Sequence, residues 1–311
     1  PDCSFDQFAG LCRDLPAAAL KSARDFIEGF EAADPGQISV FSLNRERLAE
    51  MEDGTGDLSV PRRPLGGYSQ LLHQLQTPVE LGCVVEGIRW RRGNVVIAAR
   101  RGGEPLDFRA RRTLITLPLG VLQAQPGLFD PPLSAKKAAL RCLVMSDAMR
   151  VTLRLRRPLW EEAEMPRLGF LFAGANSSGH FPVWWVRPGN AAQITGWAAG
   201  RHAWAMAGKS PEQVQSRAVA DLAAALALPA TQLEADLIAA HSHAWLQDPF
   251  SLGAYSYARA GSADAFAALA TPVDGTLYFA GEATDNTGRH ATVHGALRSA
   301  RRAVAEITAR A

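Results

Sequence analysis

The C-terminal segment constrains the fold of this chain more than any other part of the sequence. Residues 277–280 form an apolar run that predicts a buried strand, and Gly281 closes it. A helix is expected to start near Thr292, because apolar residues recur at helical spacing beyond it. They are Val293, Leu297, Ala300, Val304 and Ile307. The exposed N–H groups at such a helix start suit an electron-rich ring oxygen or a phosphate. A plain strand–turn–helix unit without a ligand is the alternative.

The rest of the chain mixes helical and strand-like patterns without regular alternation, which argues against a simple doubly wound sheet. Helices are expected at about 16–31, 134–142 and 211–228. Strands are expected at 79–81, 84–88, 94–97, 113–117, 149–155, 181–186 and 192–197. Residues 44–64 are rich in charge, glycine and proline, which predicts a loop.

Composition excludes several classes of function. The 311 residues are enough for two domains, and 33 basic against 31 acidic residues leave a net charge of +2. Binding to nucleic acid by charge is therefore not expected. No apolar run approaches the roughly 20 residues of a membrane span. The cysteines are scattered, and the histidines form no metal set; His241 and His243 alternate without an evident acidic partner. We expect no metal and no disulfide framework, and a cytoplasmic location.

A series of motifs then follows in a fixed order along the chain. They lie at residues 65–68 (Leu-Gly-Gly-Tyr), 115–122 (Ile-Thr-Leu-Pro-Leu-Gly-Val-Leu), 129–137, 159–160 (Leu-Trp), 248–257, 279–284 (Phe-Ala-Gly-Glu-Ala-Thr) and 291–297 (Ala-Thr-Val-His-Gly-Ala-Leu). Together they resemble the flavin-containing amine oxidases, the family of monoamine oxidases, polyamine oxidases and lysine-specific histone demethylases.

The resemblance implies an α+β or α/β fold with two domains. A partial FAD-binding domain would come from residues 65–118 and 258–311. A substrate domain, with a mixed sheet and flanking helices, would come from 119–257 and from a helical part at 1–64. The family opens with a Gly-x-Gly-x-x-Gly turn that holds the FAD pyrophosphate. This sequence has no such turn, since residues 174–179 have the wrong spacing.

By the same resemblance, several residues would contact FAD. Gly281 would line the flavin, Glu282 would bind its ribityl or pyrophosphate part, and Thr292 and Val293 would face its pyrimidine edge. Pro118 and Val85 are further cofactor candidates, although an ordinary strand residue explains Val85 equally well.

Lys137 is the catalytic candidate, because the family keeps a lysine there that holds a water at the flavin nitrogen receiving the hydride. Its neighbour Lys136 could take that role after a one-residue slip, and a solvated helix lysine is the structural alternative.

Aromatic walls would receive an amine and exclude water. By the resemblance, Phe250, Tyr255 and Trp185 are the substrate candidates, and Trp245 is a cofactor candidate that would lie near the flavin or the amine. A core position is the alternative for Trp185. Residues 288–290, Gly-Arg-His, stand where the family often has an aromatic, so a complete aromatic cage is not expected.

These observations favour an FAD-dependent oxidase of small-molecule amines. The carbon next to nitrogen would lose a hydride to the flavin, the imine would hydrolyse, and oxygen would become hydrogen peroxide. The alternative is an inert fragment or a subunit that needs a partner chain, or self-association, to cover the surface of the missing dinucleotide-binding half. No nucleic acid and no membrane partner is expected.

Overall fold

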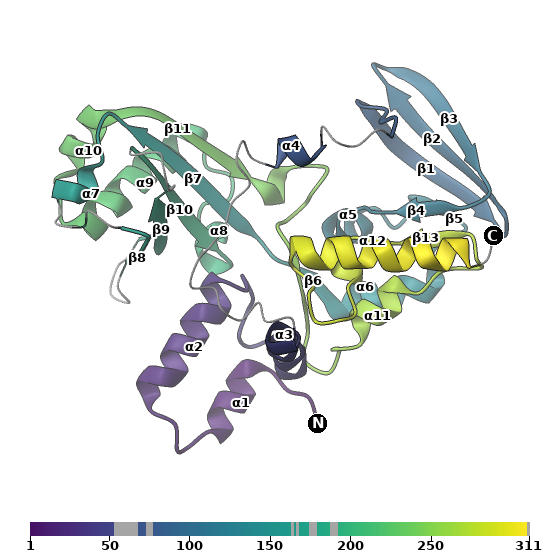
Figure 1. Ribbon diagram of the computed structural model, residues 1–311, viewed down its shortest axis with the longest axis horizontal. Helices are drawn as coiled ribbons and strands as arrows, with labels where there is room; N and C mark the ends of the chain where they lie inside the picture. Colours follow the sequence, from purple (N-terminus) through teal and green to yellow (C-terminus); the bar gives the residue numbers. More distant parts are fainter. Residues whose placement is uncertain are drawn as a thin grey trace. The chain divides into compact units, whose positions relative to one another are not determined.

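The computed structural model describes residues 1–52, 68–72, 77–162, 165, 168–173, 179–186 and 192–309 (Figure 1). The chain separates into two compact units, each built from discontinuous segments. The first unit contains Pro1–Phe41, Pro118–Leu122 and Cys142–Ala263, and the second contains Ser42–Leu117, Gln123–Arg141 and Asp264–Ala311. No helix within the described ranges is long and apolar enough to cross a membrane.

The first unit is built on a five-stranded antiparallel sheet in the order β11-β7-β10-β9-β8. Its strands are β7 (Ala148–Leu155), β8 (Phe170–Phe172), β9 (Val183–Val186), β10 (Gln193–Ala199) and β11 (Leu237–Ala244). Helix α9 (Pro211–Leu226) packs on β7 and β11. It begins with a capping box, in which the Ser210 hydroxyl accepts from the Gln213 N–H and the Gln213 side chain accepts from the Ser210 N–H. Apolar residues of the sheet and α9, including Leu153, Ile194 and Leu222, form one buried core.

Shorter elements complete the first unit. Helix α2 (Ala17–Gly29) is attached to the sheet because the Trp197 indole N–H donates to the Gly29 carbonyl at 2.9 Å. Strands β6 (Leu143–Met145) and β12 (Ser256–Ala258) pair antiparallel. The remaining elements are α1 (Phe5–Leu11), α5 (Leu119–Ala124), α7 (Leu159–Glu162), α8 (Arg201–Trp204), α10 (Ala230–Asp236) and η2 (Trp245–Gln247).

The second unit contains two small sheets. The larger has the order β3-β2-β1-β5, with β1 (Cys83–Arg91), β2 (Asn94–Arg101), β3 (Glu104–Ala110) and β5 (Phe129–Asp130). The smaller is a parallel pair of β4 (Thr113–Ile115) and β13 (Leu277–Phe279). Helix α12 (Val293–Thr308) packs on β13 and on η3 (Glu282–Thr284). The other elements are α3 (Val40–Glu52), α4 (Ser69–Leu72), η1 (Ser134–Lys136), α6 (Lys137–Cys142) and α11 (Ala265–Ala270).

The structure confirms most expected elements, including α2, α9 and α12 and the strands β1, β2, β4, β7, β9 and β10. The other strands of the two larger sheets, β3, β5, β8 and β11, were not expected. Two expectations were wrong. Residues 44–52 lie in α3 rather than in a loop, because their charged residues are mostly helix-forming Arg and Glu and the first glycine comes only at 54. Residues 79–81 precede β1 without forming a strand. The expected loop at 53–64 and the Leu-Gly-Gly of 65–67 lie outside the described residues. Residues 42–52 and 123–141 cluster with the second unit, whereas the domain functions assigned from sequence remain predictions.

A buried lysine stabilises the end of α11. The Lys136 side chain is 2% exposed, and its ammonium donates to the carbonyls of Ala268, at 2.9 Å, and Thr271. The same ammonium lies 4.6 Å from the centre of the Phe279 ring. Arg302 donates to the neighbouring Ala270 carbonyl at 3.0 Å. Two cations therefore satisfy the carbonyls left unpaired at this helix end. Burial lowers the pKa of Lys136 from its ordinary value to about 8, and the Arg302 charge adds to the shift.

This lowered pKa predicts a pH dependence of stability. Between about pH 8 and 10.5 the unfolded chain keeps the Lys136 proton while the folded chain releases it, so the folded state gains stability as pH rises. We expect the free energy of unfolding of the unsubstituted chain to rise relative to Lys136→Met over this range, in urea melts at each pH. Lys137→Met, a change at the exposed neighbouring residue, is the control. The free energy of unfolding of the unsubstituted chain should not rise relative to this variant over the same pH range. A constant difference between the chain and Lys136→Met would contradict the assignment.

Candidate active site

The C-terminal strand–turn–helix lies within the second unit and brings two predicted cofactor residues together. Gly281 lies between β13 and η3 with φ of 118°, a conformation that favours glycine, and its N–H donates to the Ser299 hydroxyl on α12 at 2.9 Å. Glu282 follows in η3, and its carboxylate accepts from the Ala291 N–H at 2.8 Å. This bond closes the loop of residues 285–291, because it joins the first residue of η3, which precedes the loop, to the last residue within the loop.

The start of α12 leaves two backbone donors available. The Thr292 hydroxyl caps the helix by accepting from the Gly295 N–H at 3.0 Å and donates to the Arg289 carbonyl at 2.6 Å. In the described part of the chain, the N–H groups of Val293 and His294 have no acceptor. Val293 is 57% exposed. The site thus offers a positive helix end with accessible N–H groups.

Helix α3 holds the loop of residues 285–291 in place. Arg289 donates to the Ala49 carbonyl at 2.7 Å, and His290 Nε2 lies 2.5 Å from Glu46 Oε1. The His290 ring is stacked on Phe266 with centroids 4.0 Å apart. His290 is buried, yet its pKa is raised: burial lowers it, but the Glu46 carboxylate and more distant carboxylates raise it by more. The sequence could not reveal this pairing, because the two partners are far apart along the chain.

The other predicted residues of the second unit lie in β1 and at the start of α6. Val85 lies half-buried in β1, next to a bulge in its pairing with β2. Lys137 begins α6 with an exposed side chain, whereas Lys136 is the buried lysine of the pair and donates to carbonyls at the C-terminal end of α11. The catalytic role of Lys137 remains a prediction.

The predicted residues of the first unit lie in three places. Pro118 directly precedes α5. Trp185 in β9 contacts Trp197, with ring centres 6.2 Å apart. Phe250 is 63% exposed and Trp245 is 38% exposed. Tyr255 is more buried, its hydroxyl donates to the Phe30 carbonyl, and burial raises its pKa. Trp245 and the Phe250 loop are joined, since the Gly253 N–H donates to the Trp245 carbonyl at 3.1 Å.

Sequence reasoning missed a buried carboxylate beside this aromatic segment. Asp147, 5% exposed, lies between β6 and β7 and accepts from the N–H groups of Ala148 and Leu246. Burial raises its pKa to about 6. The Asp147 carboxylate thereby fixes Leu246, the residue that follows Trp245. A lone Asp in a Ser-Asp-Ala turn carries no sequence signal of this role. His243 also has an acidic partner, contrary to expectation: its Nε2 lies 3.1 Å from Asp248 Oδ2.

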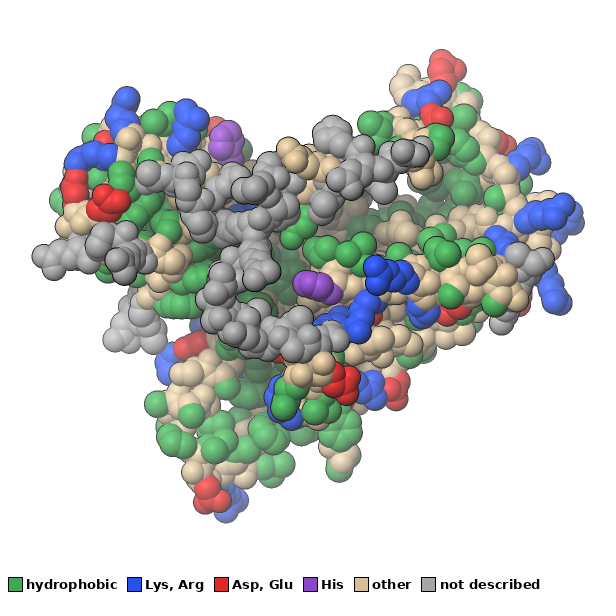
Figure 2. Space-filling model, in the orientation of Figure 1, with side chains coloured by type: hydrophobic (Ala, Val, Ile, Leu, Met, Phe, Trp, Pro, Cys, Tyr) green, Lys and Arg blue, Asp and Glu red, His purple; other side chains and the backbone are tan. Residues whose placement is uncertain are grey.

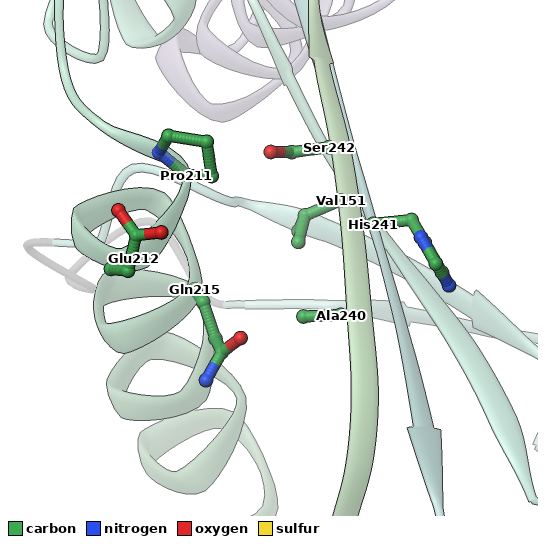
Figure 3. A pocket seen from close by; sticks show the side chains of 7 residues that line it. All are labelled: Val151, Pro211, Glu212, Gln215, Ala240, His241 and Ser242. Atoms are coloured by element: carbon green, nitrogen blue, oxygen red, sulfur yellow. The ribbon is translucent and has the colours of Figure 1, made fainter.

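A hollow in the first unit lies between α9 and β11, away from the predicted residues (Figure 3). It is lined by Val151, Pro211, Glu212, Gln215, Ala240, His241 and Ser242. Figure 3 shows Ser242 pointing toward α9 and the His241 ring pointing away from it, as alternation along a strand requires. Among the described residues, no group of three or more His, Cys, Asp or Glu side chains is placed to hold a metal ion.

Comparison with known proteins decides the family. A sequence profile described as flavin containing amine oxidoreductase matches residues 7–308. The chain belongs to this family. It is 31% identical over 249 residues to lysine-specific histone demethylase 1 homolog 1 of Arabidopsis thaliana, covering 78% of this chain and 29% of that protein. It is 29% identical over 279 residues to polyamine oxidase 4 of Oryza sativa subsp. japonica, covering 88% of this chain and 53% of that protein.

A solved structure has the same fold. A variant of putrescine oxidase, from a redesign of its cofactor binding, aligns with a TM-score of 0.81 at 21% identity, covering 99% of this chain and 68% of that one. This likeness shows that the chain has the two-part α/β fold of the flavin-containing amine oxidoreductases. The chain spans about half or less of the length of the curated relatives named above.

FAD is the cofactor that membership in this flavin family indicates, and the turn before α12 fits a flavin. The fit rests on the N–H groups of Val293 and His294, which lack acceptors in the described part of the chain, and on Gly281, which adds no side chain. Hydrogen-bond donors at a helix N-terminus suit a ring that gains negative charge on reduction. Gly281, Thr292 and Val293 would hold the ring there, with Glu282 supporting the loop.

The approach of α12 to its own loop predicts a strict need for glycine. A Cβ atom at Gly295 would lie 1.9 Å from the Arg289 carbonyl oxygen, so Gly295→Ala requires the backbone to move. We expect a loss of about 1–3 kcal/mol in the free energy of unfolding, measured by urea denaturation. Gly87→Ala is the matched control, since a Cβ there meets nothing within 4 Å. Equal stability of the two variants would contradict this packing.

Proposed function

We propose that this chain carries the C-terminal flavin site and the substrate region of an FAD-dependent amine oxidase. The observation that carries the proposal is the start of α12, where the Val293 and His294 N–H groups have no acceptor in the described part of the chain and Glu282, which follows Gly281, accepts from the nearby Ala291 N–H. Bound FAD would supply the oxidation, by accepting a hydride from the carbon next to the amine nitrogen and passing the electrons to oxygen as hydrogen peroxide. The helix end would stabilise the charge that develops on the ring.

Polyamines are the proposed substrate class. Polyamine oxidase and putrescine oxidase are among the similar proteins, and the first unit offers exposed or half-buried aromatic side chains at Trp185, Phe250 and Tyr255. A protonated amine rests favourably on an aromatic face, and such walls exclude water from a hydride transfer. Lys137 is proposed to orient a water at the flavin.

The proposed partner is a dinucleotide-binding βαβ segment with a glycine-rich turn. The printed sequence has no Gly-x-Gly-x-x-Gly turn, and the relatives and the putrescine oxidase structure are longer than this chain. Such a segment would cover α12, whose second apolar face is exposed: Val293, Leu297 and Val304 are 57%, 60% and 52% exposed. Figure 2 shows hydrophobic side chains along α12. The alternative, an inert chain, holds if no such segment restores flavin binding.

The first test is the visible spectrum after FAD is added and excess is removed by desalting. We expect oxidised-flavin bands when the chain is supplied with a βαβ segment, in the same polypeptide or separately. Glu282→Gln should raise the FAD Kd by about tenfold, because the amide cannot hold the Ala291 N–H as strongly as a carboxylate. Glu86→Gln, an exposed change in β1, is the control. A colourless protein under both arrangements would reject the proposed function.

The lysine assignment is tested by peroxide production from a polyamine by the FAD-loaded protein. We expect Lys137→Met to lower the rate by about a hundredfold, the usual loss for a group that assists proton transfer. Lys136→Met, tested beside it, separates catalysis from the support of α11. An unchanged rate in Lys137→Met would show that the catalytic assignment is wrong.

The exposed face of α12 predicts association in the absence of the βαβ segment. Sedimentation velocity should show a larger oligomeric fraction for the unsubstituted chain than for Leu297→Lys, since the lysine breaks the apolar stripe. Leu81→Lys is the control, because Leu81 is also exposed, at 79%, but lies before β1. Equal oligomeric fractions in Leu297→Lys and Leu81→Lys would show that the chains associate through another surface.

A further inference from the structure

We propose that Glu46 and His290 are positioning residues that hold the loop before α12 in the conformation required for flavin binding. The proposal rests on the proposed function, but it concerns α3, an element that the family motifs do not include. Two independent features carry it: the placement of a buried ion pair at the loop, and the backbone conformation that the loop must keep.

The pair joins α3 to the loop before α12, beside the hydrogen bond from Arg289 to the Ala49 carbonyl. His290 Nε2 lies 2.5 Å from Glu46 Oε1, with the two side chains 4% and 18% exposed. The Ser42 hydroxyl, on the same face of α3 one turn earlier, lies 3.4 Å from the same nitrogen. A buried imidazole with a carboxylate at this distance binds it as a charge-assisted hydrogen bond. The contact therefore fixes the residue two before the α12 cap directly to α3.

The loop itself is held in an uncommon conformation. Gly288 has φ of 83°, and a Cβ there would lie 2.6 Å from the Arg45 carbonyl oxygen of α3. Ala291 has φ of 60°, which is unusual for a residue with a side chain. Such a conformation persists only when its surroundings determine it. Ala291, which follows His290, leads directly into α12 and donates its N–H to Glu282. Loss of the contact between His290 and α3 would allow Ala291 to leave this conformation.

The charges around His290 favour the imidazolium. Glu46 faces it from α3, and Glu282 and Asp285 lie on the η3 side, whereas α11 contributes the neutral ring of Phe266. The neighbouring Arg289 is directed to the Ala49 carbonyl and toward Glu50, 4.0 Å away. Because the folded-state pKa of His290 is raised, the stabilisation is complete below its unfolded value near 6.5 and is lost as pH rises through the folded pKa.

The test combines two variants with a readout that does not need flavin. Glu46→Gln removes the charge but keeps the shape, and His290→Gln keeps a hydrogen-bonding side chain. Hydrogen exchange of the flavin-free chain should show faster exchange at residues 285–295 in both variants, with other segments unchanged. In the unsubstituted chain the same segment should exchange faster, relative to the intrinsic rate, as pH rises through the folded pKa. Glu46→Gln should lose this dependence. Glu52→Gln, an exposed change at the end of α3, is the control.

Flavin affinity gives the second readout, measured with the βαβ segment supplied. If the ordered loop falls to about a tenth of the population, the FAD Kd should rise about tenfold in both variants. Unchanged exchange at residues 285–295 would overturn the proposal whatever the flavin result. Faster exchange with an unchanged FAD Kd would also overturn it, since the loop would then not position the flavin. Absence of flavin binding by the unsubstituted chain would instead reject the proposed function. The hydrogen-exchange result would still decide whether Glu46 and His290 hold the loop.

Discussion

The start of α12 packs on its own preceding loop so closely that backbone contacts backbone. The Gly295 Cα faces the Arg289 carbonyl, and that carbonyl also accepts from the Thr292 hydroxyl that caps the helix. Because the cap, the loop and the first helical turn share these few atoms, none can move alone. The position of η3 and the end of β13 follow, since the Gly281 N–H is bonded to Ser299 on the next turn of α12. The candidate flavin site is therefore a consequence of one close approach.

The sequence predicted the elements that carry this approach. Strand, glycine turn and helix at 277–308 were readable because apolar periodicity and small residues are local signals. The family resemblance added roles for Gly281 and Glu282, which remain predictions. Helix α3 was missed, because its alternating Arg and Glu resemble a polar connection until Ser42 and Ala49 are seen to be buried. Its importance lies in pairing with His290, and a pairing across more than two hundred residues leaves no pattern in a single sequence.

The lysine pair shows the limit of motif reasoning at the level of one residue. A sequence motif cannot distinguish which of two adjacent lysines takes a given role. In the structure, side chains at successive positions at the start of a helix point in different directions. Here the Lys136 side chain turns inward to carbonyls at the C-terminal end of α11, and the Lys137 side chain is exposed. A charge that is 2% exposed costs free energy unless its hydrogen bonds are satisfied, so the inward lysine is explained by structure alone. Catalysis needs no part in that explanation.

Helix α12 has two apolar faces, and only one of them is used within the second unit. Gly295, Ser299 and Ala303 are buried, and these small residues let the helix lie close to β13. The large residues Val293, Leu297 and Val304 are left on the other face. A helix needs large side chains on an outer face only when something packs there, since a solvated face is ordinarily polar. The parallel pair β4–β13 adds to this argument, because parallel strands are ordinarily covered on both faces and belong to larger sheets. Both features support the proposal that a βαβ segment packs on this unit.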